Sequence, residues 1–200
     1  MTAAGASAAE RLARIIGAVR RHEPTRETRE EPFWEAAVAL ILRINAQEQL
    51  EVLFIKRATR EGDPWSGQIA LPGGRFDATD ASLEHTAIRE TLEEVQLDLR
   101  VHGTILGALN ELRPRTPILP PVIVRPFVAV VGADAPVGGS DEVAATFWVS
   151  LDLLFDPASA RETDIVVRGH PLRRPAIHFG EHAIWGLTEY ILRSFEPIAA

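Results

Sequence analysis

The chain has 200 residues, of which 46% are hydrophobic and 24% are charged, and its formal net charge is −7. This acidic balance excludes the broad basic surface of a non-specific nucleic-acid binder, and the absence of cysteine excludes disulfides, thiolate nucleophiles and cysteine-ligated zinc. No apolar run reaches the roughly 18 residues of a membrane span, and the N-terminus lacks the pattern of a secretory signal. We therefore expect a globular, cytoplasmic protein with one main domain and no membrane segment.

The first third of the chain predicts one helix followed by a pair of strands. Apolar residues recur at helical spacing near the N-terminus, and two continuous apolar runs separated by a polar turn follow a polar, proline-containing segment. The predicted elements are a helix over 7–22, a linker over 23–32, and strands over 36–44 and 50–57. We expect residues 1–32 to form an N-terminal helix and linker, and residues 33–200 to form the main domain.

The remainder of the chain predicts a mixed sheet with one long helical crossover. A loop rich in glycine and proline over 62–77 precedes a helix that begins at Asp80 or Ser82 and runs to about Val95. Strands outnumber helices, and hairpins alternate with the crossover. The later predicted elements are a strand or strand pair over 99–112, a proline-rich loop over 113–121, strands over 122–132 and 142–151, a short helix over 150–155, strands over 164–169 and 175–180, and a helix over 181–195.

The crossover helix carries an unusual density of negative charge. Glu90, Glu93 and Glu94 lie three and four positions apart, so they share one helical face and repel one another. Arg89, four residues before Glu93, offsets one charge, and the remainder suits a hard divalent cation such as Mg²⁺. A solvated acidic face is the alternative interpretation. The glycines upstream favour the ligand site, because backbone without a Cβ can approach a bound group closely.

This arrangement resembles the Nudix box, which consists of a glycine, a spaced glutamate and then Arg-Glu-aliphatic-x-Glu-Glu-x-Gly-aliphatic. The segment "RETLEEVQL" after the glycine pair of "LPGG" places Arg89, Glu90, Glu93 and Glu94 on matching positions. The resemblance implies an α/β fold of the Nudix type, an α/β/α sandwich with a mixed β-sheet between helices. It also implies a pyrophosphohydrolase that depends on Mg²⁺ or Mn²⁺.

Three positions depart from the box. Asp80 stands at the spaced acidic position, one residue further from Arg89 than the general pattern expects. Thr91 replaces an aliphatic residue, and Gln96 replaces the last glycine. Because that glycine resembles a helix C-terminal residue with positive φ, we expect local strain at Gln96.

The resemblance implies roles for individual residues. Arg89 would orient the glutamates, and Glu93 or an acid facing the box, Glu142 or its neighbour Asp141, would accept a proton from water. A backbone carbonyl of the glycine pair would assist the carboxylates at the metal. The residues that it implies for metal binding are Glu90, Glu94, Glu93 and Gly73, and those for substrate binding are Arg57, Gly67, Gly74 and Arg75.

The segment from Leu53 to Gly74 also resembles the additional signature of Nudix enzymes that hydrolyse coenzyme A. Its Arg57 and Gly67 fall on signature positions without a gap, but Asp63 stands where the signature has a second arginine. The resemblance implies hydrolysis of coenzyme A or an acyl-coenzyme A to two phosphate monoesters. ADP-ribose or another nucleotide derivative is the alternative substrate, and a non-catalytic Nudix-fold binding module is the alternative of another class. The expected partner is a small-molecule nucleotide, without nucleic acid or membrane, and a homodimer is compatible with the family.

Overall fold

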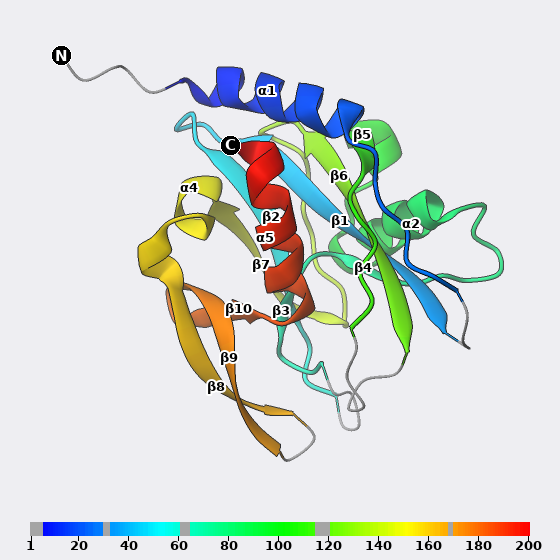
Figure 1. Cartoon of the computed structure of the whole chain (residues 1–200). Coiled ribbons are helices and arrows are strands. Elements are labelled where there is room, and N and C mark those ends of the chain that lie inside the picture. The colour runs from blue at the N-terminus through cyan, green and yellow to red at the C-terminus, as the bar shows by residue number, and fades with distance from the viewer. Residues whose placement is uncertain (1–5, 30–32, 61–64, 115–120, 168–169) are drawn as a thin grey trace.

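The structure is a computed structural model that describes residues 6–29, 33–60, 65–114, 121–167 and 170–200. Helices lie on both faces of a central sheet, and α5 crosses in front of it (Figure 1). The elements in chain order are α1 (Ala8–Arg21), β1 (Trp34–Ile44), β2 (Leu50–Arg57), β3 (Ile69–Ala70), β4 (Gly73–Arg75), α2 (Leu83–Val95), α3 (Leu99–His102), β5 (Gly103–Ala108), β6 (Val122–Val131), β7 (Val143–Ser150), α4 (Leu151–Leu154), the 3₁₀ turn η1 (Pro157–Ser159), β8 (Ala160–Val167), β9 (His170–Phe179), β10 (His182–Trp185) and α5 (Leu187–Ala199).

The central sheet has seven strands and is mixed, as predicted. Its path is β3-β2-β1-β6-β5, with β4 on β1 and β7 on β2, and β1 runs parallel to β6 while the other pairs are antiparallel. The predicted hairpin of β1 and β2 is paired only near its turn, from Leu42 opposite Val52 to Ile44 opposite Leu50. Beyond that point the short strands β3 and β4 pair with β2 and β1 and bring the glycine pair into the sheet.

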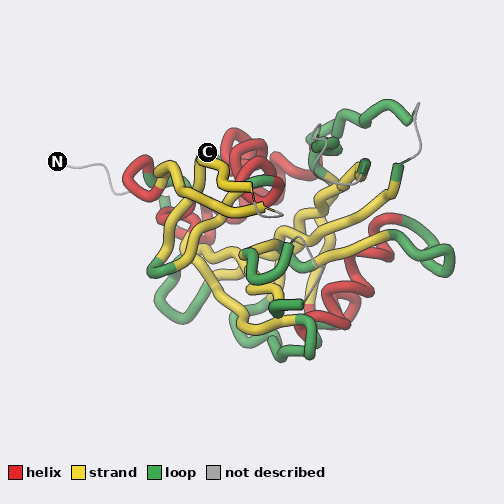
Figure 2. Tube along the Cα trace, turned by 90° about the horizontal axis from the view of Figure 1, so that it is seen from below, coloured by secondary structure: helices red, strands yellow, loops and turns green. Residues whose placement is uncertain are grey.

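The sheet separates two hydrophobic cores. Along β1, Leu40 and Leu42 pack toward the core that includes α1 and α5, while Ala39 and Ile41 pack toward α2. This explains the continuous apolar run in the sequence, because a strand covered by helices on both faces buries successive side chains on opposite sides. The view from below shows helices on either side of the strands (Figure 2).

The N-terminal helix α1 packs into the main domain. Ser7 caps it through a hydrogen bond from the backbone N–H of Glu10, and Ile15 and Val19 are fully buried in the same core as α5. Within the part of the chain that the structure describes, no helix is long and apolar enough to cross a membrane.

Two predicted elements differ from the structure. The segment 99–112 is predicted as a strand or a strand pair, but Asp98 caps the short helix α3 by accepting a hydrogen bond from Arg100 N, and β5 forms the strand of this segment. The segment 181–195 was predicted as a single helix, but its first residues form β10 in a hairpin with β9, and α5 begins only after Gly186, which has a φ of 67°. The apolar residues of 182–185 fit both periodicities, and tertiary pairing decides between them.

Candidate active site on α2 and the glycine pair

The helix α2 is positioned by an ordinary cap and a buried face. Ser82 accepts a hydrogen bond from His85 N at 3.2 Å, so the cap lies at the second of the two predicted positions. Ala87 and Val95 are fully buried against the sheet. Thr91, where the box has an aliphatic residue, is also buried, and its hydroxyl donates to the carbonyl of Ala87 at 2.7 Å. The substitution is therefore accommodated by a hydrogen bond within the helix.

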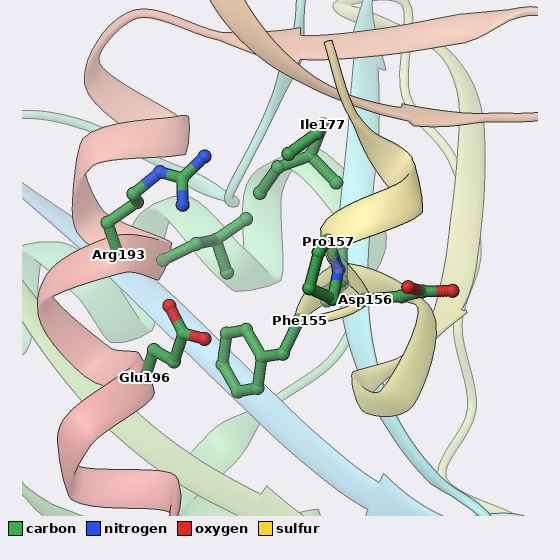
Figure 3. A pocket seen from close by; sticks show the side chains of 9 residues that line it. Phe155, Asp156, Pro157, Ile177, Arg193 and Glu196 are labelled. Atoms are coloured by element: carbon green, nitrogen blue, oxygen red, sulfur yellow. The ribbon is translucent and has the colours of Figure 1, made fainter.

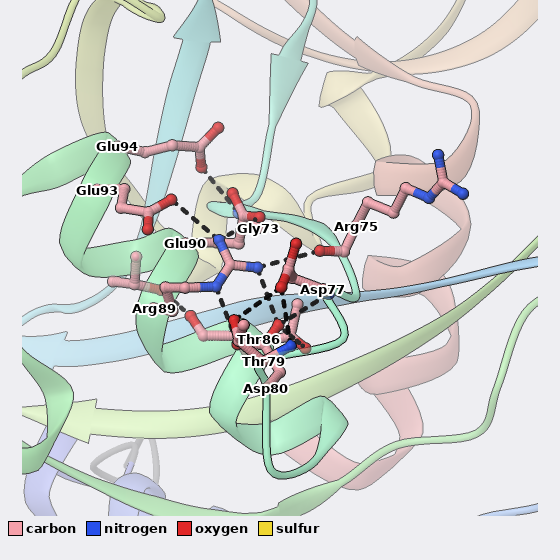
Figure 4. A network of polar contacts seen from close by, with 12 residues as sticks. Gly73, Arg75, Asp77, Thr79, Asp80, Thr86, Arg89, Glu90, Glu93 and Glu94 are labelled. Atoms are coloured by element: carbon pink, nitrogen blue, oxygen red, sulfur yellow. Dashed lines mark hydrogen bonds and ion pairs between the residues drawn. The ribbon is translucent and has the colours of Figure 1, made fainter.

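Arg89 lies at the centre of a polar network (Figure 4). Its guanidinium donates to both carboxylate oxygens of Asp80, at 2.9 and 3.0 Å, and to the carbonyl of Arg75 at 3.1 Å. Nη1 donates to Glu90 at 2.8 Å and to Glu93 at 3.0 Å. This geometry matches the expected role of Arg89, because a single side chain fixes two of the three glutamates and the strand beside them.

Asp80 is a supporting residue of this network that the sequence analysis did not identify as such. Its carboxylate is 1% exposed and also accepts hydrogen bonds from Thr86 Oγ1 at 2.8 Å and from the backbone N–H of Asp77 at 3.1 Å. The Arg89 guanidinium and these further bonds hold the pKa of Asp80 well below its ordinary value. The side chain of His85 is half-exposed, and its Nδ1 lies 3.1 Å from Asp80 Oδ1. In the sequence, this role is indicated by the position of Asp80 at the spaced acid of the box, nine residues before Arg89.

Glu94 is the most deeply buried of the three glutamates. Its side chain is 4% exposed, Oε2 accepts a hydrogen bond from Gly73 N at 2.8 Å, and Oε1 lies 3.9 Å from Arg57 Nη1. Burial raises the pKa of Glu94 from 4.5 to about 7, and the neighbouring Glu90 and Glu142 add to the rise while Gly73 and Arg57 oppose it. The N–H of Gly73, rather than the carbonyl predicted as a metal ligand, makes the observed contact with the carboxylate.

Glu90 lies directly against the second glycine of the pair. A Cβ at Gly74 would come within 2.4 Å of the Glu90 carboxyl carbon, so only glycine leaves room for this side chain. A Cβ at Gly73, where φ is 149°, would meet the carbonyl oxygen of Ala37 at 2.3 Å. Burial raises the pKa of Glu90 despite its bond to Arg89, and the charges of Glu93 and Glu142 raise it further. The glycine pair is thus required by close packing on both sides.

Two of the candidate proton acceptors, Glu93 and Glu142, are each held by a different arginine. The side chain of Glu93 is 56% exposed and is held by Arg89. That of Glu142 is 55% exposed, and Oε1 accepts a hydrogen bond from Arg60 Nη1 at 3.1 Å. The backbone carbonyl of Glu142 accepts from Ala58 N at 2.8 Å, which holds the start of β7 beside the end of β2. The negative charge of Glu142 contributes to the raised pKa values of Glu90 and Glu94, and its role as a proton acceptor stays a prediction.

The residues fit a divalent cation through charge and donor chemistry. Among the described residues no group of three acidic or histidine side chains encloses a metal position. Glu90 and Glu94, however, both have raised pKa values because burial leaves their negative charge incompletely balanced. A cation with carboxylate preference would remove that imbalance. Glu90 and Glu94 are therefore the residues that would hold it, with Glu93 at the margin.

The predicted substrate-binding residues divide into two groups. Arg57, Gly67 and Gly74 lie at the box or in the loop beside it, since Gly67 N donates to the carbonyl of Arg57 at 3.2 Å. The guanidinium of Arg75 points away from the carboxylates (Figure 4) and lies over the ring of Trp34, 4.1 Å from its centroid. Asp63 lies outside the described residues.

Gln96 adopts the left-handed conformation that its position predicts. Its φ is 57° and ψ 24°, and its N–H donates to the carbonyl of Leu92. The side chain compensates part of the strain, because Nε2 donates to the carbonyl of Gly139 at 2.7 Å. A Cβ at Gly138 would meet the Gln96 amide oxygen at 2.4 Å, so a glycine opposite makes room for the glutamine. The helix end is preserved without the glycine of the box.

A hollow of about 170 Å³ between α5 and the 3₁₀ turn lies apart from this network (Figure 3). Its lining includes Phe155, Ile177, Arg193 and Glu196, and none of the predicted site residues takes part. We therefore assign the candidate active site to α2, the glycine pair and the start of β7.

Comparison with known proteins identifies one family and several relatives. The family model of the NUDIX domain matches residues 34–168. Over 156 residues, 78% of this chain and 78% of the relative, the sequence is 33% identical to "Uncharacterized Nudix hydrolase NudL" of Enterobacter sp. (strain 638). The crystal structure of a MutT/nudix family protein from Enterococcus faecalis is similar with a TM-score of 0.56, at 20% identity, over 94% of this chain and 69% of that one. A C. elegans Ap4A hydrolase in a binary complex gives a TM-score of 0.55, at 19% identity, over 82% of this chain and 96% of that one. The two structures support the α/β/α arrangement.

Proposed function

Since the chain belongs to the Nudix hydrolase family, we propose that it hydrolyses the pyrophosphate bond of coenzyme A or an acyl-coenzyme A with Mg²⁺ or Mn²⁺. The family places the enzyme among pyrophosphohydrolases that act on nucleoside diphosphate derivatives, and this disfavours the non-catalytic binding module. The observation that carries the proposal is the contact of two carboxylates, the partly buried Glu90 and the buried Glu94, with the glycine pair. A diphosphate lying along that backbone would meet both the carboxylates and the cation that they attract.

Each of the residues at the site has a separate role in the proposed reaction. When bound, the cation neutralises the diphosphate and increases the acidity of the attacking water. Glu90 and Glu94 hold the cation, and Arg89 keeps Glu90 and Glu93 in place. Glu142 accepts the proton from water, with Glu93 as the second candidate. Little covalent chemistry is needed, because phosphoryl transfer depends mainly on positioning and charge stabilisation.

The substrate assignment rests on the signature that runs through the glycine loop. Arg57 occupies a signature position and lies 3.9 Å from Glu94, where it can reach a phosphate held at the carboxylates. ADP-ribose or a related nucleotide is the second candidate, because Asp63 replaces the signature's second arginine. An aspartate about 4 Å from the 3′-phosphate of coenzyme A would repel it by on the order of 4 kcal/mol, and by less when hydrated.

One set of assays tests the activity and the substrate together. Mg²⁺-dependent hydrolysis of coenzyme A, acyl-coenzyme A, ADP-ribose and NADH is measured, with product masses recorded. The kcat/KM for coenzyme A is then compared with that for its 3′-dephosphorylated form, in the parent and in Asp63→Arg. Similar values in both proteins support coenzyme A. A parent preference for the dephosphorylated form of about tenfold or more, reversed by Asp63→Arg, assigns specificity to the aspartate and refutes coenzyme A. A homodimer remains a prediction that light scattering would check.

A further inference from the structure

A second hollow, of about 360 Å³, lies where the glycine loop meets a second, three-stranded sheet of order β10-β9-β8. Lys56 of β2 and the segment 66–69 form one wall, and β10 with part of β8 forms the other. Figure 1 shows β10 beside β3, which continues the loop. None of the catalytic or metal-binding residues named above lines this hollow.

The hollow adjoins the active site through a single stretch of backbone. Arg57 donates its N–H to the carbonyl of Gln68 at 2.9 Å and accepts from Gly67, so the loop is tied to the end of β2. Consecutive strand residues point to opposite faces. The guanidinium of Arg57 accordingly lies near Glu94, while Lys56 lines the hollow. The carboxylates and the hollow therefore lie on opposite faces of the sheet at the end of β2, and a group attached to a phosphate at the carboxylates would have to pass around this end to enter the hollow.

The lining combines planar rings with hydrogen-bonding groups. Gln68 contributes an amide and Lys56 an ammonium group, while His182 and Trp185 contribute rings. The hydroxyl of Ser66 is already bonded to the backbone N–H and carbonyl of Arg60. The ring of His182 packs against that of Phe147, with the two centroids 4.6 Å apart. A bare phosphate would require several cations, whereas the described lining holds one lysine, Lys56, and one acid, Glu181. An acyl chain would require a continuous apolar wall. A base attached to ribose offers a π-face and polar edges, and the volume suits it.

We propose that this hollow binds the nucleoside half of the substrate, with Trp185 stacking on the base. The inference rests on the proposed function, because it takes the substrate to be a nucleotide derivative. The family match ends at residue 168, so β9 and β10 lie beyond the part that carries the shared chemistry. The chain would thus obtain part of its selectivity for the base from the C-terminal hairpin of β9 and β10, outside the matched segment.

The test measures ligand binding separately from turnover. Calorimetric titration of the full chain with AMP and with ribose 5-phosphate is carried out in the parent, Trp185→Leu and Trp185→Phe. A matched control is Tyr190→Leu, which removes an aromatic ring that is 60% exposed on α5 and does not line the hollow. We expect Trp185→Leu to weaken AMP by about tenfold or more and to leave ribose 5-phosphate unchanged. Trp185→Phe should retain most of the AMP affinity, and Tyr190→Leu all of it.

Several results would overturn the inference. These are an absence of AMP binding to the parent, an equal loss of AMP and ribose 5-phosphate in Trp185→Leu, or parental AMP affinity in that variant. Hydrolysis assays of the same proteins keep the two proposals apart. If the parent hydrolyses diphosphates but the AMP affinity is the same in the parent and in Trp185→Leu, only the proposed nucleoside site is refuted. A parent without turnover, whose AMP affinity depends on Trp185, refutes only the proposed function.

Discussion

The substitution Gly74→Ala should displace a single carboxylate while leaving the fold intact. The new methyl would lie 2.4 to 2.6 Å from the three atoms of the Glu90 carboxyl group, so that group must recede by about 1 Å to reach ordinary contact at 3.4 Å. Gly74 does not have a positive φ, so alanine fits its backbone. The obstructed atoms form the far end of a flexible side chain, which can rotate away and lose its bond to Arg89. A misplacement of about 1 Å at a reacting centre costs on the order of 100-fold in rate.

The assay compares kcat at saturating Mg²⁺, Mn²⁺ affinity and the melting temperature in the parent and in Gly74→Ala. We expect kcat to fall by about two orders of magnitude and Mn²⁺ binding to weaken, with little change in melting temperature. The control is Gly139→Ala, because a Cβ there meets nothing within 4 Å. Parental kcat and Mn²⁺ affinity in Gly74→Ala would show that the position of Glu90 is not needed at the cation, and the reasoning above would fail.

Three further substitutions test the acids one at a time, and Glu162→Gln serves as a control for the last of them. Glu94→Gln should reduce kcat by about 100- to 1,000-fold, the usual loss for a group that stabilises charge, and a variant that turns over like the parent contradicts the metal assignment. Because burial raises the pKa of Glu94 to about 7, its contribution to the stability of metal-free protein is fully present below pH 4.5 and is lost as the pH rises through 7. The melting temperature in EDTA should therefore fall across this range, by the equivalent of up to about 3 kcal/mol from Glu94, and the fall should be smaller in Glu94→Gln, where only Glu90 retains a raised pKa. Glu142→Gln should lower kcat far more than it raises KM if Glu142 is the base, and partial rescue by high Mg²⁺ would instead make it a ligand. The buried Glu111 pairs with Arg29 and Arg125. Glu111→Gln should therefore lower the free energy of unfolding in urea by about 3 to 5 kcal/mol, whereas substitution of the exposed Glu162 by glutamine should lower it by less than about 1 kcal/mol.

The part of the site that could be predicted is the part set by local spacing. The helical repeat alone places Glu90 and Glu94 on one face, and the structure adds that both meet the glycine pair. The same local logic predicted a strained helix end at Gln96, whose φ of 57° confirms it. Apolar periodicity also predicted the sheet's central strands, because both of their faces are buried.

What could not be predicted depends on contacts distant in sequence. The spaced acidic position marks Asp80 in the sequence, but its bond to Arg89 requires the loop before α2 to fold back onto the helix, and the spacing alone does not show that contact. The strand β10 was predicted as helix for the same reason, since its pairing with β9 through Gly180, at a φ of 52°, decides its conformation. The ion pairs of Glu111 join residues far apart in the chain: Arg29 precedes β1 and Arg125 lies within β6.

The segment between α1 and β1 has a consequence for hydrogen exchange. Residues 22–29 of this segment form no helix or strand, yet Thr25 N donates to the Asn110 side chain at 2.9 Å and Glu27 N donates to Glu111 at 2.8 Å, while Glu111 N donates back to the carbonyl of Thr25. Hydrogen bonds and ion pairs to Arg29 and Arg125 and a bond from Glu27 N hold the pKa of Glu111 at about 2 against the effect of burial. The amides of Thr25 and Glu27 should therefore exchange with deuterium slowly, as strand amides do. Their exchange rates would report directly on whether α1 is docked on the catalytic domain.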